Sequence, residues 1–320
     1  MKNKGIVILI LSLLVIIVLL ITMDFSSTRV DNRPDNPYEY EVDEFKEVPA
    51  GLIHYKETRQ FRMKADELKG ISYNDSKIYI IADNSLRIID ENGVQINKFA
   101  LDDSARCVKV YETPGILIGF RNYFSVYDQD GERLVQSDKL NDKAVITSVA
   151  KKGDKIFLAD AGNRKIWVYN SEGKKMDEFE GVSGSSVLHG FIVPSPYFDI
   201  AVNQNNELWV VNPGMHALQH YSDNGNLENF WEKSSINIEG FSGCCNPAHF
   251  TFLPGGNFIT SEKGMVRIKE YNAKGELLSV VAPPAKFRDE GQAPEVVADE
   301  NGNVIALDFD RKLIRFFKHN

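Results

Sequence analysis

Cysteine is scarce in this chain of 320 residues, which contains only Cys107, Cys244 and Cys245. So few cysteines exclude a disulfide-rich scaffold. A chain of this length can bury a large enough core without such cross-links. After the first few residues the chain has no dense run of lysine or arginine, and its formal net charge is −8. Both features argue against nucleic acid as a partner.

The common catalytic signatures are missing as well. The chain contains no GxSxG, no HExxH and no glycine-rich phosphate-binding loop. An apolar pattern with a helical period of 3.6 is also missing beyond the N-terminus, so we expect few helices in the globular part. The sequence therefore indicates no particular cofactor, and it favours a non-enzymatic role while leaving catalysis open.

One long apolar run is present, Gly5–Met23, and it holds 19 residues without a charge. A helix of that length is about 28 Å long, close to the thickness of a bilayer core. Lys2 and Lys4 precede the run, and the positive-inside rule then predicts a cytoplasmic N-terminus. A cleaved signal peptide is the alternative, although a small-x-small cleavage signature is missing. Both interpretations export the rest of the chain.

The remainder divides into a polar stretch and a series of repeats. We expect a cytoplasmic tip at residues 1–4, a transmembrane signal anchor at 5–23, a polar linker at 24–50 and a globular domain at 51–320. This organisation predicts a single-pass protein of the cell membrane with its domain outside the cytoplasm, in the periplasm if the cell is Gram-negative.

The repeats consist of an apolar strand, a turn, a second strand and a turn that closes on glycine. The closing glycines are Gly93, Gly131, Gly173, Gly225 and Gly275, at spacings of 38, 42, 52 and 50 residues. Repeats of 40 to 50 residues with several short strands are typical of β-propellers. Six copies of the second strand predict an all-β, six-bladed propeller. The sixth copy lacks a fourth strand, and we expect residues 52–61 to supply it and close the ring.

The best-formed repeat is Ala159–Gly173, with the sequence ADAGNRKIWVYNSEG. It resembles the repeat of the NHL propellers, as do Phe191–Pro194 and Asn246-Pro247, and the resemblance covers roughly residues 65–320. It implies a six-bladed propeller like those of bacterial, membrane-anchored proteins. Propellers of this kind include binding scaffolds, extracytoplasmic sensors, and a few lyases and hydrolases.

Lettering the four strands of a blade A to D places the D-to-A and B-to-C connections on one face, around the mouth of the central channel. The distinctive residues fall in these connections. We predict that this face binds a membrane or extracytoplasmic protein or a small ligand. The candidate binding residues are Arg121, Arg164, Tyr197, Asp199, His216, Glu262 and Lys263.

The strongest irregularity is the run Gly243-Cys244-Cys245-Asn246-Pro247-Ala248-His249. The adjacent cysteines could form a strained vicinal disulfide with a redox role. Together with His249 they could instead ligate a soft metal ion, or they could simply be small buried residues. The sequence thus predicts a binding, scaffold or sensor propeller. A metal-assisted lyase or hydrolase using Asp199, His216, His249 or Glu262, and a redox accessory protein using Cys244-Cys245, are the alternatives.

Overall fold

The computed structural model describes residues 11–19, 42–111, 115–181 and 190–320. A helix covers residues 11–19, and the other residues of the predicted span 5–23 lie outside the described part. Among the described residues, no helix has the length and apolar character needed to cross a membrane. Residues Asp43–Asn320 form one compact unit, and the following description concerns that unit.

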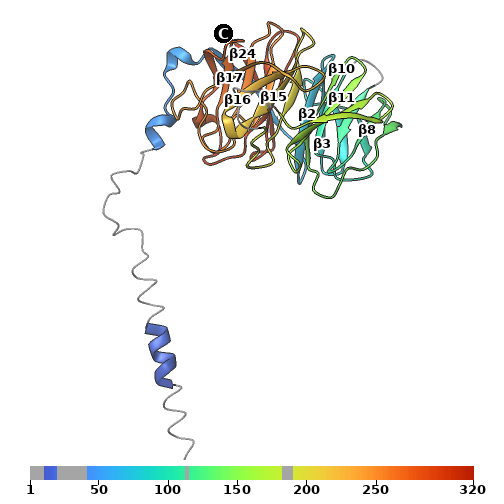
Figure 1. The fold of residues 1–320 in the computed structure, drawn as a ribbon. Coiled ribbons are helices and arrows are strands. Elements are labelled where there is room, and N and C mark those ends of the chain that lie inside the picture. Colours follow the sequence, from blue (N-terminus) through green and yellow to red (C-terminus); the bar gives the residue numbers. More distant parts are fainter. Residues whose placement is uncertain (1–10, 20–41, 112–114, 182–189) are drawn as a thin grey trace, which may run out of the picture. The chain divides into compact units, whose positions relative to one another are not determined.

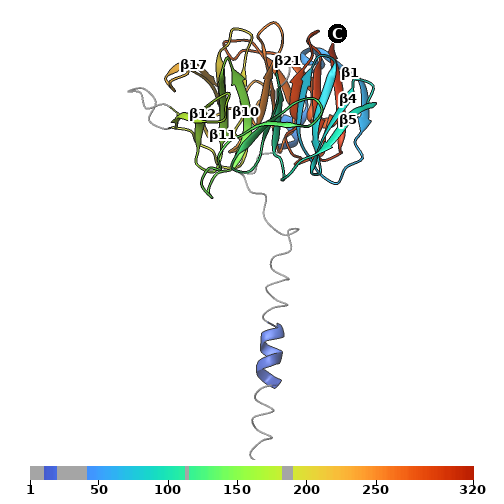
Figure 2. The same ribbon diagram turned by 90° about the vertical axis from the view of Figure 1, so that its right-hand side faces the viewer.

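Six antiparallel sheets of four strands make up the unit, which confirms the predicted six-bladed propeller. In Figure 2, strands β10, β11 and β12 of the third sheet lie side by side in green. The first three blades contain β2 (Leu68–Asn74), β3 (Lys77–Ala82), β4 (Ser85–Asp90) and β5 (Gln95–Ala100); β6 (Cys107–Val110), β7 (Ile116–Gly119), β8 (Phe124–Tyr127) and β9 (Arg133–Gln136); and β10 (Ile146–Lys152), β11 (Lys155–Asp160), β12 (Lys165–Asn170) and β13 (Lys175–Phe179).

The fourth and fifth blades follow the same chain order, and Figure 1 labels β15, β16 and β17 of the fourth, whereas the sixth takes its outer strand from before the first blade. They contain β14 (Ile200–Val202), β15 (Leu208–Asn212), β16 (Ala217–Tyr221) and β17 (Leu227–Glu232); β18 (His249–Phe252), β19 (Phe258–Ser261), β20 (Ile268–Tyr271) and β21 (Leu277–Ala282); and β22 (Glu295–Ala298), β23 (Val304–Asp308), β24 (Leu313–His319) and β1 (Tyr55–Arg62). Short 3-10 helices are η2 (Val42–Lys46), η3 (Ala50–Leu52), η4 (Pro213–Met215) and η5 (Pro284–Lys286).

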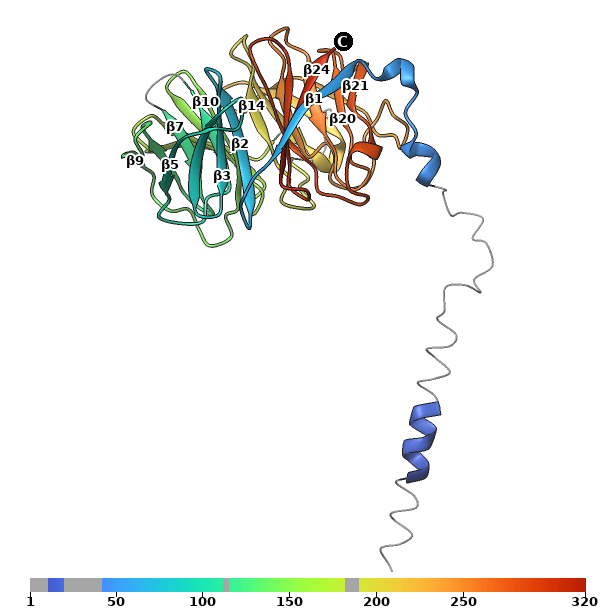
Figure 3. The ribbon, with the colours of Figure 1, turned by 180° about the vertical axis from the view of Figure 1, so that it is seen from behind.

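The sixth blade takes its fourth strand from the beginning of the unit, as the strand count predicts. β1 pairs antiparallel with β24, from Tyr55 opposite His319 to Arg62 opposite Leu313. Figure 3 shows β1 in blue beside β24 in red. The guanidinium of Arg315 on β24 donates two hydrogen bonds of 2.9 Å to Glu57 on β1. Because both ends of the unit meet in one sheet, the last blade has no unpaired outer edge.

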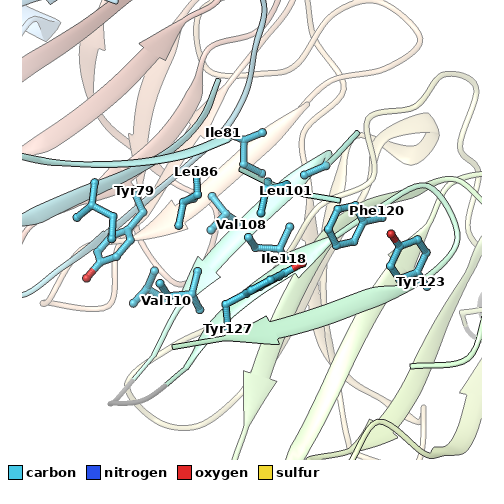
Figure 4. Close-up of a cluster of buried hydrophobic side chains, with 13 residues drawn as sticks. Tyr79, Ile81, Leu86, Leu101, Val108, Val110, Ile118, Phe120, Tyr123 and Tyr127 are labelled. Atoms are coloured by element: carbon cyan, nitrogen blue, oxygen red, sulfur yellow. The ribbon is translucent and has the colours of Figure 1, made fainter. Parts of the chain in front are cut away.

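The core is distributed between neighbouring blades. Six buried apolar clusters occupy the six interfaces, and the one between the sixth and first blades packs Ile305 and Phe316 against Ile71 and Ile80. Figure 4 shows the cluster between the first two blades, where Tyr79 and Ile81 meet Val108, Ile118 and others. Since β strands alternate their side chains, each blade presents an apolar face to both neighbours.

The repeated glycines serve these interfaces as well as the turns. All five closing glycines have positive φ angles, between 74° and 92°. A side chain at Gly275 would place its Cβ only 2.6 Å from the ring of Trp231, on the outer strand of the preceding blade. The position therefore requires glycine both for its left-handed backbone and for its close packing.

Candidate functional site

The six innermost strands, β2, β6, β10, β14, β18 and β22, contact one another in a closed circle around the central channel. At the end where the D-to-A and B-to-C connections gather, the channel opens into a hollow of about 320 Å³, which we call the mouth hollow. It is lined by Glu67, Leu68, Lys69, Arg106, Ile146, Thr147, Pro196, Tyr197, His249, Gln292, Glu295 and Phe309. Every blade contributes to this lining, so the hollow exists only when the ring is closed.

A much smaller cavity of about 30 Å³ lies in the channel and shares Glu295 with the mouth hollow. Its lining includes Cys107 and Lys109 from β6, together with Asp199 at the start of β14. Burial lowers the pKa of Lys109 and raises that of the Cys107 thiol. Ionisable groups thus occupy a channel whose other lining residues are mostly apolar, with Ser148 and Thr251 as polar exceptions.

Asp199 and His249 form a pair beside the mouth hollow. The His249 Nδ1 atom lies 3.7 Å from Asp199 Oδ2, which also accepts the Phe250 N–H at 3.0 Å. Burial disfavours the imidazolium, but the adjacent Asp199 carboxylate outweighs it and raises the pKa of His249.

Glu295 stands at the junction between the mouth hollow and the channel cavity. Its Oε2 atom accepts one hydrogen bond, from the Ile71 N–H at 3.2 Å. Burial, reinforced by the negative charge of Asp199, raises the pKa of Glu295 to about 8. The side chain is therefore mostly a neutral carboxylic acid at pH 7, with a proton to donate.

Two basic residues, Lys69 and Arg106, also line the mouth hollow and differ in their partners. The Lys69 ammonium contacts Glu67 at 3.1 Å and donates a hydrogen bond of 2.6 Å to Ser104. Within the described residues, the Arg106 guanidinium makes no hydrogen bond or ion pair. Lys69 is thus neutralised locally, whereas Arg106 keeps all its donors available.

The cysteine loop, residues 243–249, forms one side of the mouth. The Cys244 and Cys245 sulfur atoms lie 3.2 Å apart as free thiols, with Cys244 exposed and Cys245 buried. Burial alone would raise the pKa of Cys245, but the polar groups around the thiol, Ser195, Cys244 and Lys263, hold it below its ordinary value.

Asn246 holds the cysteine loop in place. Its amide donates hydrogen bonds to the carbonyls of Ser242 and Lys263, at 2.7 and 3.1 Å, and its Oδ1 accepts the Lys263 N–H at 2.9 Å. The imidazole Nδ1 of His216 lies 2.7 Å from the Asn246 carbonyl. His216 and Lys263 therefore support the loop, and the pair of cysteines rests on a well-fixed backbone.

Tyr197 connects this loop to the mouth hollow. Its ring meets the His249 imidazole edge-on, with centroids 5.5 Å apart, and the Lys263 ammonium lies 5.3 Å from the ring centroid. Of the predicted binding residues, Tyr197 lines the hollow and Asp199 lines the channel cavity below it. Arg121 and Arg164 are exposed but do not line the mouth hollow, and Arg164 borders a separate depression with Phe179 and Phe191.

Glu262 was expected at the mouth, and the structure places it in the interior instead. Its carboxylate lies between the Arg267 guanidinium, at 2.7 Å, and the Lys269 ammonium, at 2.9 Å, and all three side chains are 0% exposed. The two cations also donate to backbone carbonyls of residues 236–240. Glu262 therefore fixes the connection between β17 and β18 from inside the fifth blade.

Two other acidic residues, at the end of β11 and directly after β3, act in a similar way. The buried Asp160 Oδ1 accepts the N–H groups of Val145, Gly162 and Asn163, at 2.8 to 3.1 Å. Asp83 likewise accepts two backbone N–H groups, from Asp66 and Glu67. These repeated carboxylates position the connections around the mouth, so their recurrence reflects folding.

Sequence reasoning missed three residues, Arg106, Lys109 and Glu295. A usable signal was present, because a charged residue in a short innermost strand such as CVKV or EVVA must face either an apolar interface or the channel. Among the described residues, no three His, Cys, Asp or Glu side chains are grouped so as to hold a metal ion. Cys244, Cys245 and His249, one of the alternatives considered for the cysteine run, are therefore not among such groups in the described part of the chain.

Comparison with known proteins identifies the fold. No family model matches the chain, so the NHL resemblance has no such support, and no curated protein matches it in sequence. Similar solved structures include a streptogramin B lyase, with a TM-score of 0.60 and 13% identity over 83% of this chain and 98% of that one. The virginiamycin B lyase from Staphylococcus aureus has a TM-score of 0.59 and 14% identity over 83% and 100% of the two chains.

The WD40 propeller domain of Doa1 is also similar, with a TM-score of 0.55 and 13% identity over 79% of each chain. Identities this low establish a shared propeller architecture and nothing about activity.

Proposed function

We propose that this protein is a binding propeller that takes a small ligand in the mouth hollow. The observation that carries the proposal is an opening of about 320 Å³ to which all six blades contribute and in which the Arg106 side chain has no partner among the residues that the structure describes. Small-molecule sites in proteins are typically concave, largely apolar and furnished with a few polar groups. The hollow is concave and contains apolar Leu68, Pro196 and Phe309, but more of its lining residues are polar, Arg106 and Glu295 among them.

The test is whether small molecules bind in the hollow. A mixed panel of anionic, neutral and cationic fragments would be screened against the full chain by saturation-transfer NMR. Gln292→Trp places a large ring at the exposed rim of the hollow, whereas Gln60→Trp places the same ring on exposed β1, away from it. We expect bound fragments to be lost from the first variant and retained by the second. Equal binding by both variants, or no binding at all, would refute the proposal.

We further propose that residues 5–23 anchor the protein in the cell membrane and that the propeller lies outside the cytoplasm. Support comes from the uncharged run itself and from the lysines that precede it. The measurement is fractionation combined with protease treatment of intact spheroplasts. Recovery of the full-length chain in the soluble cytoplasmic fraction would contradict the anchor.

The cysteine pair supports a second candidate, a redox accessory role. The sulfur separation of 3.2 Å means that only a small displacement is needed to reach disulfide bonding distance. Thiol counting with and without reductant tests it, and the idea fails if both cysteines remain free thiols under air.

Metal-assisted lyase or hydrolase chemistry is the third candidate, with His249 and Asp199 as the only close pair among its proposed ligands. Metal analysis of the purified protein distinguishes it from the binding role.

A further inference from the structure

We infer that the mouth hollow selects a small molecule bearing a carboxylate, held by the Arg106 guanidinium and by a hydrogen bond from the acid form of Glu295. This inference rests on the proposed function and specifies its ligand class. The two residues are far apart in the sequence, Arg106 just before β6 and Glu295 at the start of β22, and both line the same hollow.

The basic side of the hollow favours an anion. Lys69 is already paired with Glu67, whereas Arg106 has no partner within the described residues. A guanidinium presents parallel donors that match the two oxygens of a carboxylate. An incoming carboxylate would therefore gain a charge-assisted contact without breaking an existing ion pair.

The acidic side of the hollow does not oppose an anion, because Glu295 is held in its neutral form. The charged or ionisable groups that line the hollow and the cavity with it are, in chain order, Glu67 just before β2, Lys69 on β2, Arg106 just before β6, Cys107 and Lys109 on β6, Tyr197 and Asp199 just before β14, and His249 on β18. Burial and the Asp199 charge raise the pKa of Glu295 to about 8, although His249 and Lys109 act in the opposite direction. The protonated carboxyl can then donate to an anionic oxygen.

The remaining wall of the hollow is partly apolar, beside the polar Thr147 and Gln292. Leu68, Pro196 and Phe309 contribute to it, and Tyr197 presents an aromatic ring. A ligand that combines an apolar body with a single carboxylate matches this division better than a highly charged anion such as inorganic phosphate.

The first experiment compares three probes of nearly equal shape, namely benzoate, benzamide and benzylammonium. Saturation-transfer NMR or calorimetry on the full chain would give their affinities at pH 7. We expect benzoate to bind at least about tenfold more tightly than the other two, the size of one charge-assisted hydrogen bond. Arg106→Gln should weaken benzoate binding by a similar factor. Arg121→Gln is the matched control, since Arg121 is an exposed arginine on the same face but outside the hollow.

The second experiment follows benzoate affinity from pH 6 to pH 9.5. As Glu295 ionises, it changes from a donor to a like charge, so affinity should fall by about tenfold or more through pH 8. Glu295→Gln keeps a donor that does not titrate, so the fall in benzoate affinity through pH 8 should be much smaller in this variant, and the pH dependence that remains should come from His249, which also lines the hollow and has a raised pKa. A purely structural role for Glu295 would not produce this change in the pH profile.

The outcomes separate this inference from the proposed function. Benzamide or benzylammonium binding as tightly as benzoate, with loss in Gln292→Trp only, would leave the binding role standing and overturn the carboxylate preference. A pH-independent affinity in the unsubstituted protein would overturn the role of Glu295. Absence of binding by every probe would overturn both.

Discussion

Replacing Glu262 by glutamine tests the assignment of this residue to the interior of the fifth blade. The change keeps the shape of the side chain but removes the negative charge that lies 2.7 Å from Arg267 and 2.9 Å from Lys269. Two cations with no exposed surface would then lack their counter-ion. Breaking a buried ion pair in this way destabilises proteins by about 3 to 5 kcal/mol.

The structure sets the expected value within that range. Arg267 and Lys269 keep backbone carbonyl partners in residues 236–240, which partly compensate for the lost carboxylate. We therefore expect the free energy of unfolding to fall by about 3 kcal/mol, near the lower end. Adding Lys269→Met should recover part of this loss. It removes one uncompensated charge and leaves an apolar side chain between the rings of Phe241 and Tyr271.

The assay is urea unfolding at pH 7, followed by tryptophan fluorescence. Asp102→Asn is the control, because the Asp102–Arg133 pair is at the surface, with side chains 69% and 44% exposed. Its removal should change the stability by less than about 1 kcal/mol. If Glu262→Gln proved as mild as this control, the buried triad would not hold the fifth blade together and the reasoning would be wrong.

Three further predictions concern the turns, the closing strand and the thiols. In urea unfolding, Gly275→Ala should lower the free energy of unfolding by about 3 kcal/mol, and Gly256→Ala should lower it by only about 1 kcal/mol. Both glycines have a positive φ, but only at Gly275 would the added Cβ lie 2.6 Å from an aromatic ring. Burial opposes ionisation of Glu57, but the Arg315 guanidinium outweighs burial and lowers the pKa of Glu57. This carboxylate therefore contributes stability above its unfolded pKa, and the contribution is lost as the pH falls through the folded value. In thermal melts, Glu57→Gln should lose less stability on acidification than the unsubstituted protein. Under native, reduced conditions Ellman's reagent should label the exposed Cys244 rapidly, whereas the buried Cys107 should react only after unfolding, and rapid labelling of Cys107 would contradict its placement in the channel.

Most of the fold could be read from the sequence, because a propeller repeats one local pattern. All six predicted blades form, each as a sheet of four strands. The closing role of β1 followed from counting strands. The membrane anchor and the NHL relationship remain predictions from the sequence.

The candidate site was much less predictable. Tyr197 and Asp199 were correctly placed near the channel, but Arg121, Arg164 and Glu262 occur in equivalent connections and do not line the mouth hollow. Sequence position assigns a residue to a connection, and the direction of its side chain depends on how that connection packs. Glu262 turns inward because Arg267 and Lys269 supply a buried counter-charge.

By itself, then, the sequence determined the number of blades, their strand order and the face on which the connections gather. These properties depend on periodic apolar residues and on turn glycines, which act over a few neighbouring positions. Only the tertiary structure decided that Arg106 has no side-chain partner among the described residues, that the pKa of Glu295 is raised, and that both residues line one hollow. Those properties arise where six distant segments converge on the channel, because burial and neighbouring charge are set by the closed ring and not by local sequence.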